Sequence, residues 1–279
     1  MLVWHRGHII PADSLRVEVA DSVFEHGLGL FETLRASQGR PLWLGRHLER
    51  MARSAQVLGL PPLTVNDLPD ERSIQDLLQA DSRTNALVRI TRTGGGAVAP
   101  TLWVRTGPLP LDIPKLGATI IEAPFRVDCD DPLARHKTLN YWARRIAYDR
   151  AVEQGGHEAL IFDRRDRPCE GSRTNLFVVN GDTVVTPPLT DPIVPGLMRH
   201  AVIESAVEIG LRVVEASLSQ DDLRNCSEIF LTNSVRGIIP VVRLMGTVDR
   251  RLSGDFPTVA LLRQTLTDAS FEEPERSQL

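Results

Sequence analysis

Lys137 is the residue of this chain with the clearest chemical potential. The sequence holds 32 lysines and arginines, but only Lys115 and Lys137 are lysines and the other 30 are arginines. An arginine stays protonated, whereas a desolvated lysine amine can lose its proton and act as a nucleophile or base. Lys115 lies among prolines and is expected to be an exposed linker residue. Lys137 precedes Asn140, a plausible helix cap, so its amine could serve chemistry, although a plain surface lysine is the alternative.

Three other polar segments could complete a site. Glu170 follows a charged loop and leads into an apolar strand, Pro195-Gly196 opens a helix, and Asn233-Ser234 lie in a turn between two apolar strands. Each segment has an ordinary explanation, because turns contain such residues and most helix starts bind only water. Together with Lys137, however, they supply what pyridoxal phosphate needs. That cofactor takes a lysine for its aldehyde, an acid for its pyridine nitrogen and an anion site of helix ends and turns for its phosphate.

The composition is that of a folded protein that binds neither nucleic acid nor membrane. Hydrophobic residues make up 42% of the chain, charged residues 24%, and the net charge is -4. Three widely spaced cysteines form neither a disulfide framework nor a metal pattern, which favours a reducing cytoplasm. The seven histidines lack ligand spacing, so no metal is expected. The first residues lack the apolar core of a signal peptide, and no run reaches membrane length.

Strand and helix patterns alternate in both halves of the chain. In the first half we predict strands in 2–10 (bent at Arg6-Gly7), 17–19, 30–36, 86–91 and 102–104, and helices over 46–58 and 65–79. In the second half we predict strands at 118–122, 160–162, 176–179, 229–231 and 238–242, and helices over 141–154, 196–209 and 259–266.

A proline-rich stretch divides these two halves. It cannot continue a helix or a central strand. We therefore expect a first domain over 1–110, a linker over 111–116 and a second domain over 117–279, with an α/β or α+β fold.

The motifs and their order resemble the class IV aminotransferases, the fold-type IV pyridoxal phosphate enzymes. The motifs that carry the resemblance are Gly29-Leu-Phe-Glu-Thr33, His47-Leu-Glu-Arg50, Lys137-Thr-Leu-Asn140, Glu170-Gly-Ser-Arg-Thr-Asn-Leu-Phe177, Pro195-Gly-Leu-Met-Arg199 and Thr232-Asn-Ser-Val-Arg-Gly-Ile-Ile-Pro240. The group includes branched-chain aminotransferases, D-amino acid transaminases and aminodeoxychorismate lyase. The resemblance implies an N-terminal α/β sandwich and a C-terminal pseudo-barrel, with the cofactor between them, in a homodimer.

The resemblance also implies roles for single residues. Lys137 would carry the cofactor and then move the substrate proton. Glu170 would keep the pyridine nitrogen protonated through a charge-assisted pair. Arg50 would bind the phosphate. It lies opposite the apolar stripe of its predicted helix; such a position usually faces solvent, but here it fits a helix with one side on its own core and the other toward the cleft.

The remaining implied contacts come from the second half of the chain and from Tyr141. Leu197 and Met198 would present backbone N–H groups to the phosphate, although many relatives have threonine at the Met198 position. Asn233 and Ser234 would form a turn between the phosphate and the substrate carboxylate. Tyr141 resembles a tyrosine that touches the ring oxygen, but it lies one residue closer to the lysine than in branched-chain enzymes, and a packed aromatic residue is the alternative.

Three details favour the lyase branch of the family, which serves folate biosynthesis. One is the length of 279 residues, which suits the short branch of the family. Thr33 and the stretch Gly196-Leu-Met-Arg199 resemble the lyase, although Gly94–Val98 lacks its usual Arg-Gly-Tyr ending. The resulting expectation is conversion of 4-amino-4-deoxychorismate to 4-aminobenzoate and pyruvate, with Lys137 taking the ring proton and Thr33 helping to protonate the leaving group.

Two alternatives stay open. One is an aminotransferase of branched-chain or D-amino acid type, and the other is a non-catalytic binding protein that kept the fold. The expected substrate is a small amino compound with a carboxylate. Its ligand is left open among four arginines, Arg35, Arg89, Arg105 and Arg236.

Overall fold

The structure is a computed structural model that describes residues 1–110, 114, 116–252 and 254–269. It divides into two compact units. The first unit contains residues 1–110 together with His136–Tyr141, and the second contains the described residues of 111–135 and 142–279. The segment with Lys137 therefore packs with the first unit, although it follows the predicted linker in sequence. Of that linker, residues 111–113 and 115 lie outside the described residues.

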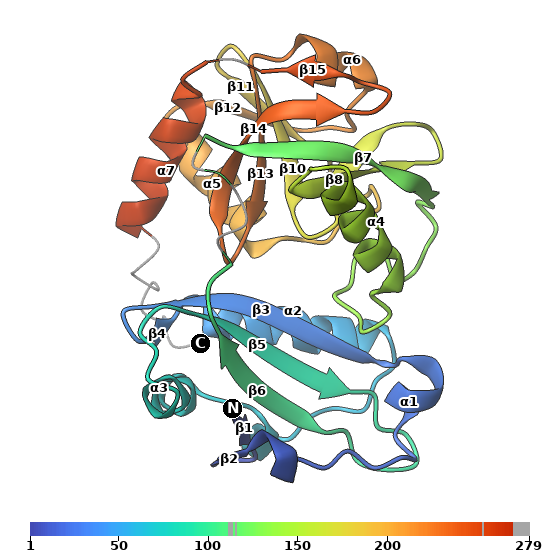
Figure 1. The fold of residues 1–279 in the computed structure, drawn as a ribbon, viewed down its shortest axis with the longest axis vertical. Helices are drawn as coiled ribbons and strands as arrows, with labels where there is room; N and C mark the ends of the chain where they lie inside the picture. Colours follow the sequence, from blue (N-terminus) through green and yellow to red (C-terminus); the bar gives the residue numbers. More distant parts are fainter. Residues whose placement is uncertain (111–113, 115, 253, 270–279) are drawn as a thin grey trace. The chain divides into compact units, whose positions relative to one another are not determined.

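The first unit is built on a six-stranded antiparallel sheet with the strand order β2-β1-β6-β5-β3-β4 (Figure 1). Its strands are β1 (Leu2–His5), β2 (His8–Pro11), β3 (Gly29–Ser37), β4 (Arg40–Pro41), β5 (Ala86–Thr93) and β6 (Leu102–Gly107). Its helices are α1 (Ser22–His26), α2 (Leu44–Val57) and α3 (Glu71–Ala80).

One face of this sheet packs against α2 and α3. Leu34 and Ile90 of the sheet join Met51 of α2 and Leu77 of α3 in one buried core. Side chains alternate along a strand, so Leu30, Glu32 and Leu34 share the helix-covered face while Phe31 and Thr33 point to the opposite face. Glu32 and Thr33 of β3 therefore point to opposite faces of the sheet, each toward its own group of polar side chains.

The second unit contains a nine-stranded mixed sheet that closes into a barrel. The strand order is β12-β11-β10-β13-β14-β7-β8-β9, β9 also pairs with β10, and β15 pairs with β14. The extra pairing places Asn175 opposite Glu170 and closes the ring of strands. The strands are β7 (Ala118–Val127), β8 (Glu158–Asp163), β9 (Pro168–Gly171), β10 (Asn175–Asn180), β11 (Thr183–Thr186), β12 (Arg212–Glu215), β13 (Glu228–Asn233), β14 (Gly237–Met245) and β15 (Arg250–Arg251). The helices are α4 (Trp142–Glu153), α5 (Leu197–Glu208), α6 (Gln220–Asn225) and α7 (Pro257–Ala269).

Apolar residues fill this second unit in two clusters. The larger cluster joins residues of β7, β8, β10, β13 and β14, among them Ile120, Phe162 and Leu231. A smaller cluster packs Ala147 and Ala151 of α4 on Ile121 and Ile161 of the sheet. The predicted α/β class with a C-terminal pseudo-barrel is therefore confirmed.

Most predicted elements are present, and the exceptions have local causes. The strand predicted at 17–19 is absent, because those residues make no strand pairing. The helix predicted over 65–79 is split into a 3-10 turn, Val65–Asp67, and α3, which starts after Pro69 where Asp70 accepts a hydrogen bond from the Ser73 N–H at 2.7 Å. The short elements α1, β9, β12, β15 and α6 were not predicted.

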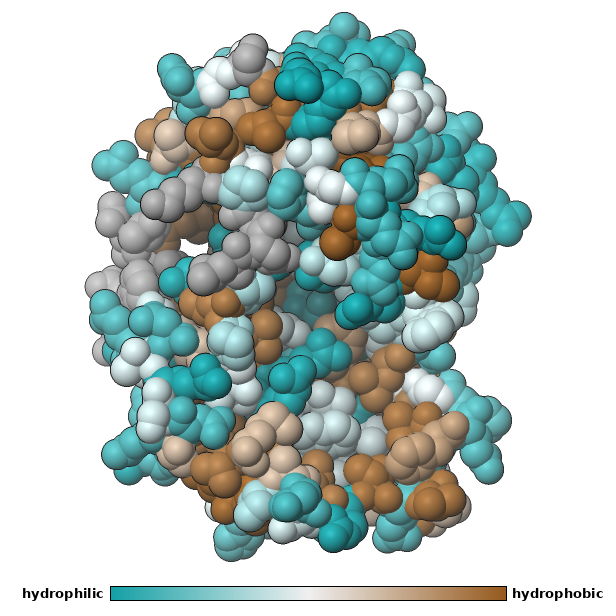
Figure 2. Space-filling model, viewed as in Figure 1, coloured by the Kyte–Doolittle hydropathy of each residue, from teal (hydrophilic) through white to brown (hydrophobic). Residues whose placement is uncertain are grey.

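Asn140 is not the helix cap that the sequence suggested. Helix α4 begins at Trp142, and the Asn140 side-chain amide donates instead to the Gly27 carbonyl at 3.3 Å. Figure 2 shows hydrophilic side chains interspersed with hydrophobic ones on the viewed face of each unit. Among the described helices, none has the length and apolar content needed to cross a membrane.

Candidate active site

The segment that carries Lys137 is fixed to strand β3 by backbone hydrogen bonds. The Phe31 N–H donates to the Lys137 carbonyl at 2.9 Å, and the Leu139 N–H donates to the Gly29 carbonyl at 2.9 Å. This approach needs a glycine at position 29, because a Cβ there would lie 2.5 Å from the Leu139 side chain and 2.6 Å from the Arg92 carbonyl oxygen. Gly29, the first residue of β3, therefore allows the Lys137 segment to pack closely against this strand.

The Lys137 amine lies beside an aromatic ring and a cluster of polar side chains. Its Nζ is 4.7 Å from the Phe31 ring centroid, and the Arg89 guanidinium carbon is 3.7 Å from the same centroid. Tyr141 meets this ring edge-on, with centroids 5.2 Å apart. The Arg89 Nη1 also donates to the Thr33 hydroxyl at 3.5 Å. Phe31 is therefore a shared neighbour of the amine and the guanidinium.

Arg89 stands next to a second arginine across the sheet. Arg105 is its register partner on β6 and Thr33 is its partner on β3. Burial first, and then the positive charge of Arg105, lower the pKa of Arg89 to about 10. Among the described residues, neither arginine has a carboxylate within ion-pair distance. An anion bound between the two guanidinium groups would stabilise both of their positive charges.

The other face of β3 holds a buried charged group. The Arg50 Nε donates to Glu32 Oε1 at 2.8 Å, its Nη2 donates to Oε2 at 2.6 Å, and His47 Nδ1 lies 2.7 Å from Oε2. Burial opposes ionisation of Glu32, but the Arg50 guanidinium and His47 together outweigh it and hold the pKa of Glu32 well below its usual range. Burial lowers the pKa of His47, with smaller contributions from the positive charges of Arg50 and Lys137.

Arg50 is thus not on a solvent-facing side of its helix, since it is only 7% exposed. His47 Nδ1 faces the Glu32 carboxylate, while its Nε2 is buried without a hydrogen-bond partner among the described residues. Arg50 is oriented by a carboxylate that the sequence analysis did not assign to the site. Both Glu32 and His47 lie inside the motifs quoted above, so the sequence did contain a feature that could have indicated them as site residues.

In the second unit, Glu170 is buried on β9 and is bound at both carboxylate oxygens. It is 2% exposed. Arg144 of α4 donates to Oε1 at 2.5 Å, and the Asn175 side chain and the Val194 N–H donate to Oε2 at 3.2 Å and 3.0 Å. Charge-assisted bonds of this kind stabilise the ionised carboxylate. No sequence motif indicated Arg144, whereas Asn175 belongs to the Glu170 motif.

The first turn of α5 and the turn after β13 are the anion-site candidates of this unit. Leu197 and Met198 begin the helix after the cap residue Gly196, so their N–H groups precede the first intrahelical bonds. A Cβ on Gly196 would lie 1.9 Å from the Asn175 Oδ1. The Asn233 Oδ1 accepts from the Val235 and Arg236 N–H groups at 3.0 Å and 2.8 Å and so shapes the turn that contains Ser234.

These donors fit pyridoxal phosphate. The second unit offers a buried carboxylate for the pyridine nitrogen and a helix start for the phosphate. The hydroxyl of Thr232, next to Asn233, is buried without a hydrogen-bond partner among the described residues, which also suits a polar ligand. The first unit offers the lysine. The chemistry of both sets of residues agrees with the cofactor expected from the sequence.

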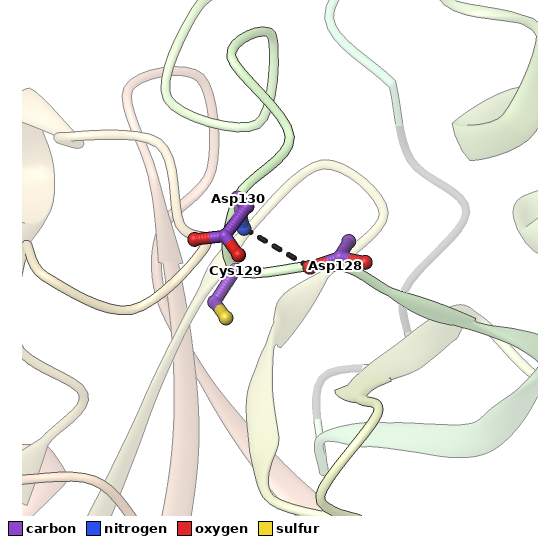
Figure 3. A group of neighbouring side chains, drawn as sticks. All are labelled: Asp128, Cys129 and Asp130. Atoms are coloured by element: carbon purple, nitrogen blue, oxygen red, sulfur yellow. Dashed lines mark hydrogen bonds between the residues drawn. The ribbon is translucent and has the colours of Figure 1, made fainter.

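A third polar group, in the second unit, has a simpler origin. Asp128, Cys129 and Asp130 bring donor atoms within 4.8 Å of one another (Figure 3). They are consecutive residues of one turn, closed by a hydrogen bond from the Asp130 N–H to the Asp128 carboxylate at 3.1 Å. Asp128 also pairs with Arg164 at 3.2 Å. Adjacency in sequence therefore accounts for this cluster.

Comparisons with known proteins identify the class. The family model described as amino-transferase class IV matches residues 29–244. The chain therefore belongs to the class IV aminotransferases, which are pyridoxal phosphate enzymes.

Individual relatives fall into three branches of that family. A protein of Methanocaldococcus jannaschii named "Putative branched-chain-amino-acid aminotransferase" is 30% identical over 89% of each chain. The D-alanine aminotransferase of Bacillus licheniformis is 25% identical over 88% of this chain and 89% of its own length. A crystal structure from Legionella pneumophila, titled "Putative 4-amino-4-deoxychorismate lyase", is 26% identical with a TM-score of 0.80, covering 91% of this chain and 97% of that one.

Proposed function

We propose that this protein is a pyridoxal phosphate-dependent aminotransferase that acts on a small amino acid. The observation that carries the proposal is the position of the Lys137 amine and the Arg89 guanidinium on one aromatic ring, Phe31. An amine for proton transfer and a cation for a substrate carboxylate are the two groups that an aminotransferase needs from the protein. Two sequence motifs favour the lyase, but the relatives named as branched-chain and D-alanine aminotransferases support amino-group transfer.

In this proposal the cofactor supplies an electron-withdrawing ring that stabilises negative charge on the substrate carbon. Lys137 binds the cofactor aldehyde and moves the proton that leaves the substrate. Glu170 accepts a hydrogen bond from the pyridine nitrogen. Backbone N–H groups of Leu197 and Met198 bind the phosphate, with Arg50 as a further cation and the turn of Asn233 and Ser234 beside it. Tyr141 packs edge-on against Phe31, the ring that also lies beside the Lys137 amine.

Arg89 and Arg105 are the proposed ligands of the substrate carboxylate. Both lie on the sheet face of Phe31 and Thr33, and neither has an ion-pair partner among the described residues. Of the four arginines that the sequence left open, the proposal takes Arg89 and Arg105 and leaves out Arg35 and Arg236.

Aminodeoxychorismate lyase is the second candidate. Thr33, the residue that suggested it, is held by Arg89 on the same face as the Lys137 amine. The Legionella structure with the lyase title adds support.

One experiment separates the candidates. The purified, cofactor-loaded protein is mixed with a panel of L- and D-amino acids, and the visible absorption of the bound cofactor is followed. Loss of absorption with at least one donor, restored by a keto acid, supports an aminotransferase. Pyruvate release from aminodeoxychorismate without spectral response to amino acids supports the lyase. No response in either arm contradicts both and favours a non-catalytic binding protein.

The family resemblance also leads us to propose a cytoplasmic homodimer. Light scattering in solution should then give about twice the mass of one chain. A monomer mass at working concentration would contradict the dimer.

A further inference from the structure

Arg144 donates hydrogen bonds to the carboxylate of Glu170 and to three backbone carbonyls. Its Nη1 donates to the Gly171 and Ser172 carbonyls, each at 3.4 Å, and its Nη2 donates to the Ala134 carbonyl at 3.5 Å and to Glu170 Oε1 at 2.5 Å. The side chains of Arg144 and Glu170 are 19% and 3% exposed. The guanidinium is therefore fixed in place by backbone carbonyls and cannot swing away from the acid without losing several bonds.

The opposite oxygen of Glu170 is fixed by neutral donors. Asn175 and the Val194 N–H bind Oε2, and the Asn175 amide is itself anchored by donating to the Val194 carbonyl at 2.8 Å. Arg144 is a charged donor to this acid, whereas Asn175 and Val194 are neutral donors. A cation therefore binds one oxygen of the carboxylate, and neutral donors bind the other.

We propose that Arg144 is a positioning residue that limits how strongly Glu170 attracts the proton of the cofactor's pyridine nitrogen. The inference rests on the proposed pairing of Glu170 with that nitrogen. A carboxylate whose charge is offset by a guanidinium is a weaker base, and the guanidinium also repels a protonated ring. Arg144 thereby sets the electron demand of the ring and, through it, the ease of proton removal from substrate.

A purely structural role is the competing explanation, because Arg144 also ties α4 to the loop after β9. Two variants separate charge from anchoring. Arg144→Gln keeps a hydrogen-bond donor and removes the charge, whereas Arg144→Lys keeps the charge and removes the planar fork. A structural staple would make both variants less stable without changing the protonation of the ring nitrogen.

The test uses holoenzyme loaded with cofactor labelled with nitrogen-15 in the ring, followed by NMR across a pH series. Arg144→Gln should keep the nitrogen protonated to a pH about one unit higher than the unmodified protein, and Arg144→Lys should match the unmodified protein. An unchanged titration in Arg144→Gln overturns the inference. If Arg144→Gln does not bind cofactor, Arg144→Met, which also removes the charge, is used in its place: a titration shifted to higher pH supports the charge role, and an unchanged titration overturns it.

Glu170→Gln tells the two proposals apart. If this variant moves the nitrogen titration and Arg144→Gln does not, the role of Arg144 is wrong and the role of Glu170 stands. If Glu170→Gln leaves the titration unchanged as well, the acid does not bind the ring nitrogen and the proposed site fails with it. The cofactor dissociation constant of each variant gives a readout that does not depend on turnover.

Discussion

Arg50 and Glu32 form a two-pronged ion pair inside the first unit, with Nε to Oε1 at 2.8 Å and Nη2 to Oε2 at 2.6 Å. The side chains are 9% and 1% exposed. A guanidinium held by such a fork has its remaining donors fixed in direction. Glu32 therefore orients Arg50, the residue that the family resemblance assigns to the cofactor phosphate.

Removing the acid of this pair should destabilise the protein. Glu32→Gln leaves Arg50 as a buried charge without its counter-ion, and breaking a buried pair in this way costs about 3–5 kcal/mol. Denaturant unfolding should show this loss, accompanied by weaker cofactor binding. The matched control is Glu49→Gln on the exposed side of the same helix, which should stay within about 0.5 kcal/mol of the unmodified protein. Equal effects of both changes would contradict the role of Glu32.

The same carboxyl group predicts a pH dependence. Its folded pKa lies well below the ordinary value of 4.5, so its contribution is fully present above pH 4.5 and is lost as the pH falls toward the folded pKa. Below pH 4.5 only the unfolded state takes up the proton, which lowers the free energy of unfolding by about 1.4 kcal/mol per pH unit. The difference in stability between the unmodified protein and Glu32→Gln should therefore shrink below pH 4.5 and stay constant above it. A difference that grows as the pH falls would refute this assignment.

Gly196 should not accept a side chain. The new Cβ of Gly196→Ala would lie 1.9 Å from Asn175 Oδ1, and Asn175 is a donor to Glu170. We expect a loss of about 1–3 kcal/mol in stability and weaker cofactor binding, because Asn175 must move. Gly107→Ala is the control, since its Cβ would be 3.9 Å from the nearest atom, Arg105 Nη1. Unaltered cofactor affinity in Gly196→Ala would show that Asn175 does not support Glu170.

Arg89 should determine substrate binding. Arg89→Gln removes the cation proposed for the substrate carboxylate, and losing a charged hydrogen-bond partner costs about 1.5–3 kcal/mol. KM for the best amino donor should rise roughly 10- to 100-fold, with a smaller change in kcat. Arg40→Gln, which removes a cation that is mostly exposed and pairs with Glu71, should leave KM unchanged. A normal KM in Arg89→Gln would exclude Arg89 as the carboxylate ligand.

The sequence could predict the elements with strong periodicity and the residues inside long motifs. Helix α2 and the strands β3 and β5 follow directly from apolar spacing, and Lys137 stands out because lysine is so rare in this chain. Short elements such as β9 and α6 depend on tertiary pairing, which a local pattern does not contain. The partners Arg144 and Glu170 are far apart in sequence, and nothing near Arg144 indicates which acid it meets.

The ion pair that buries Arg50 could not be predicted from the helical pattern of α2. Arg50 lies opposite an apolar stripe, a pattern typical of an exposed residue. It is buried because Glu32 on the neighbouring strand offers a carboxylate on the same face. The ion pair depends on how α2 packs against β3, which a local sequence pattern does not contain.

We propose that Lys137 forms the covalent bond with the cofactor, and the presence of only two lysines in the sequence makes this proposal directly testable. The loaded protein is treated with borohydride, digested and analysed by mass spectrometry, alongside Lys137→Ala and Lys115→Ala. The account predicts one reduced cofactor on the Lys137 peptide, retained in Lys115→Ala and lost in Lys137→Ala. A label on Lys115, or a labelled Lys137→Ala protein, would contradict it.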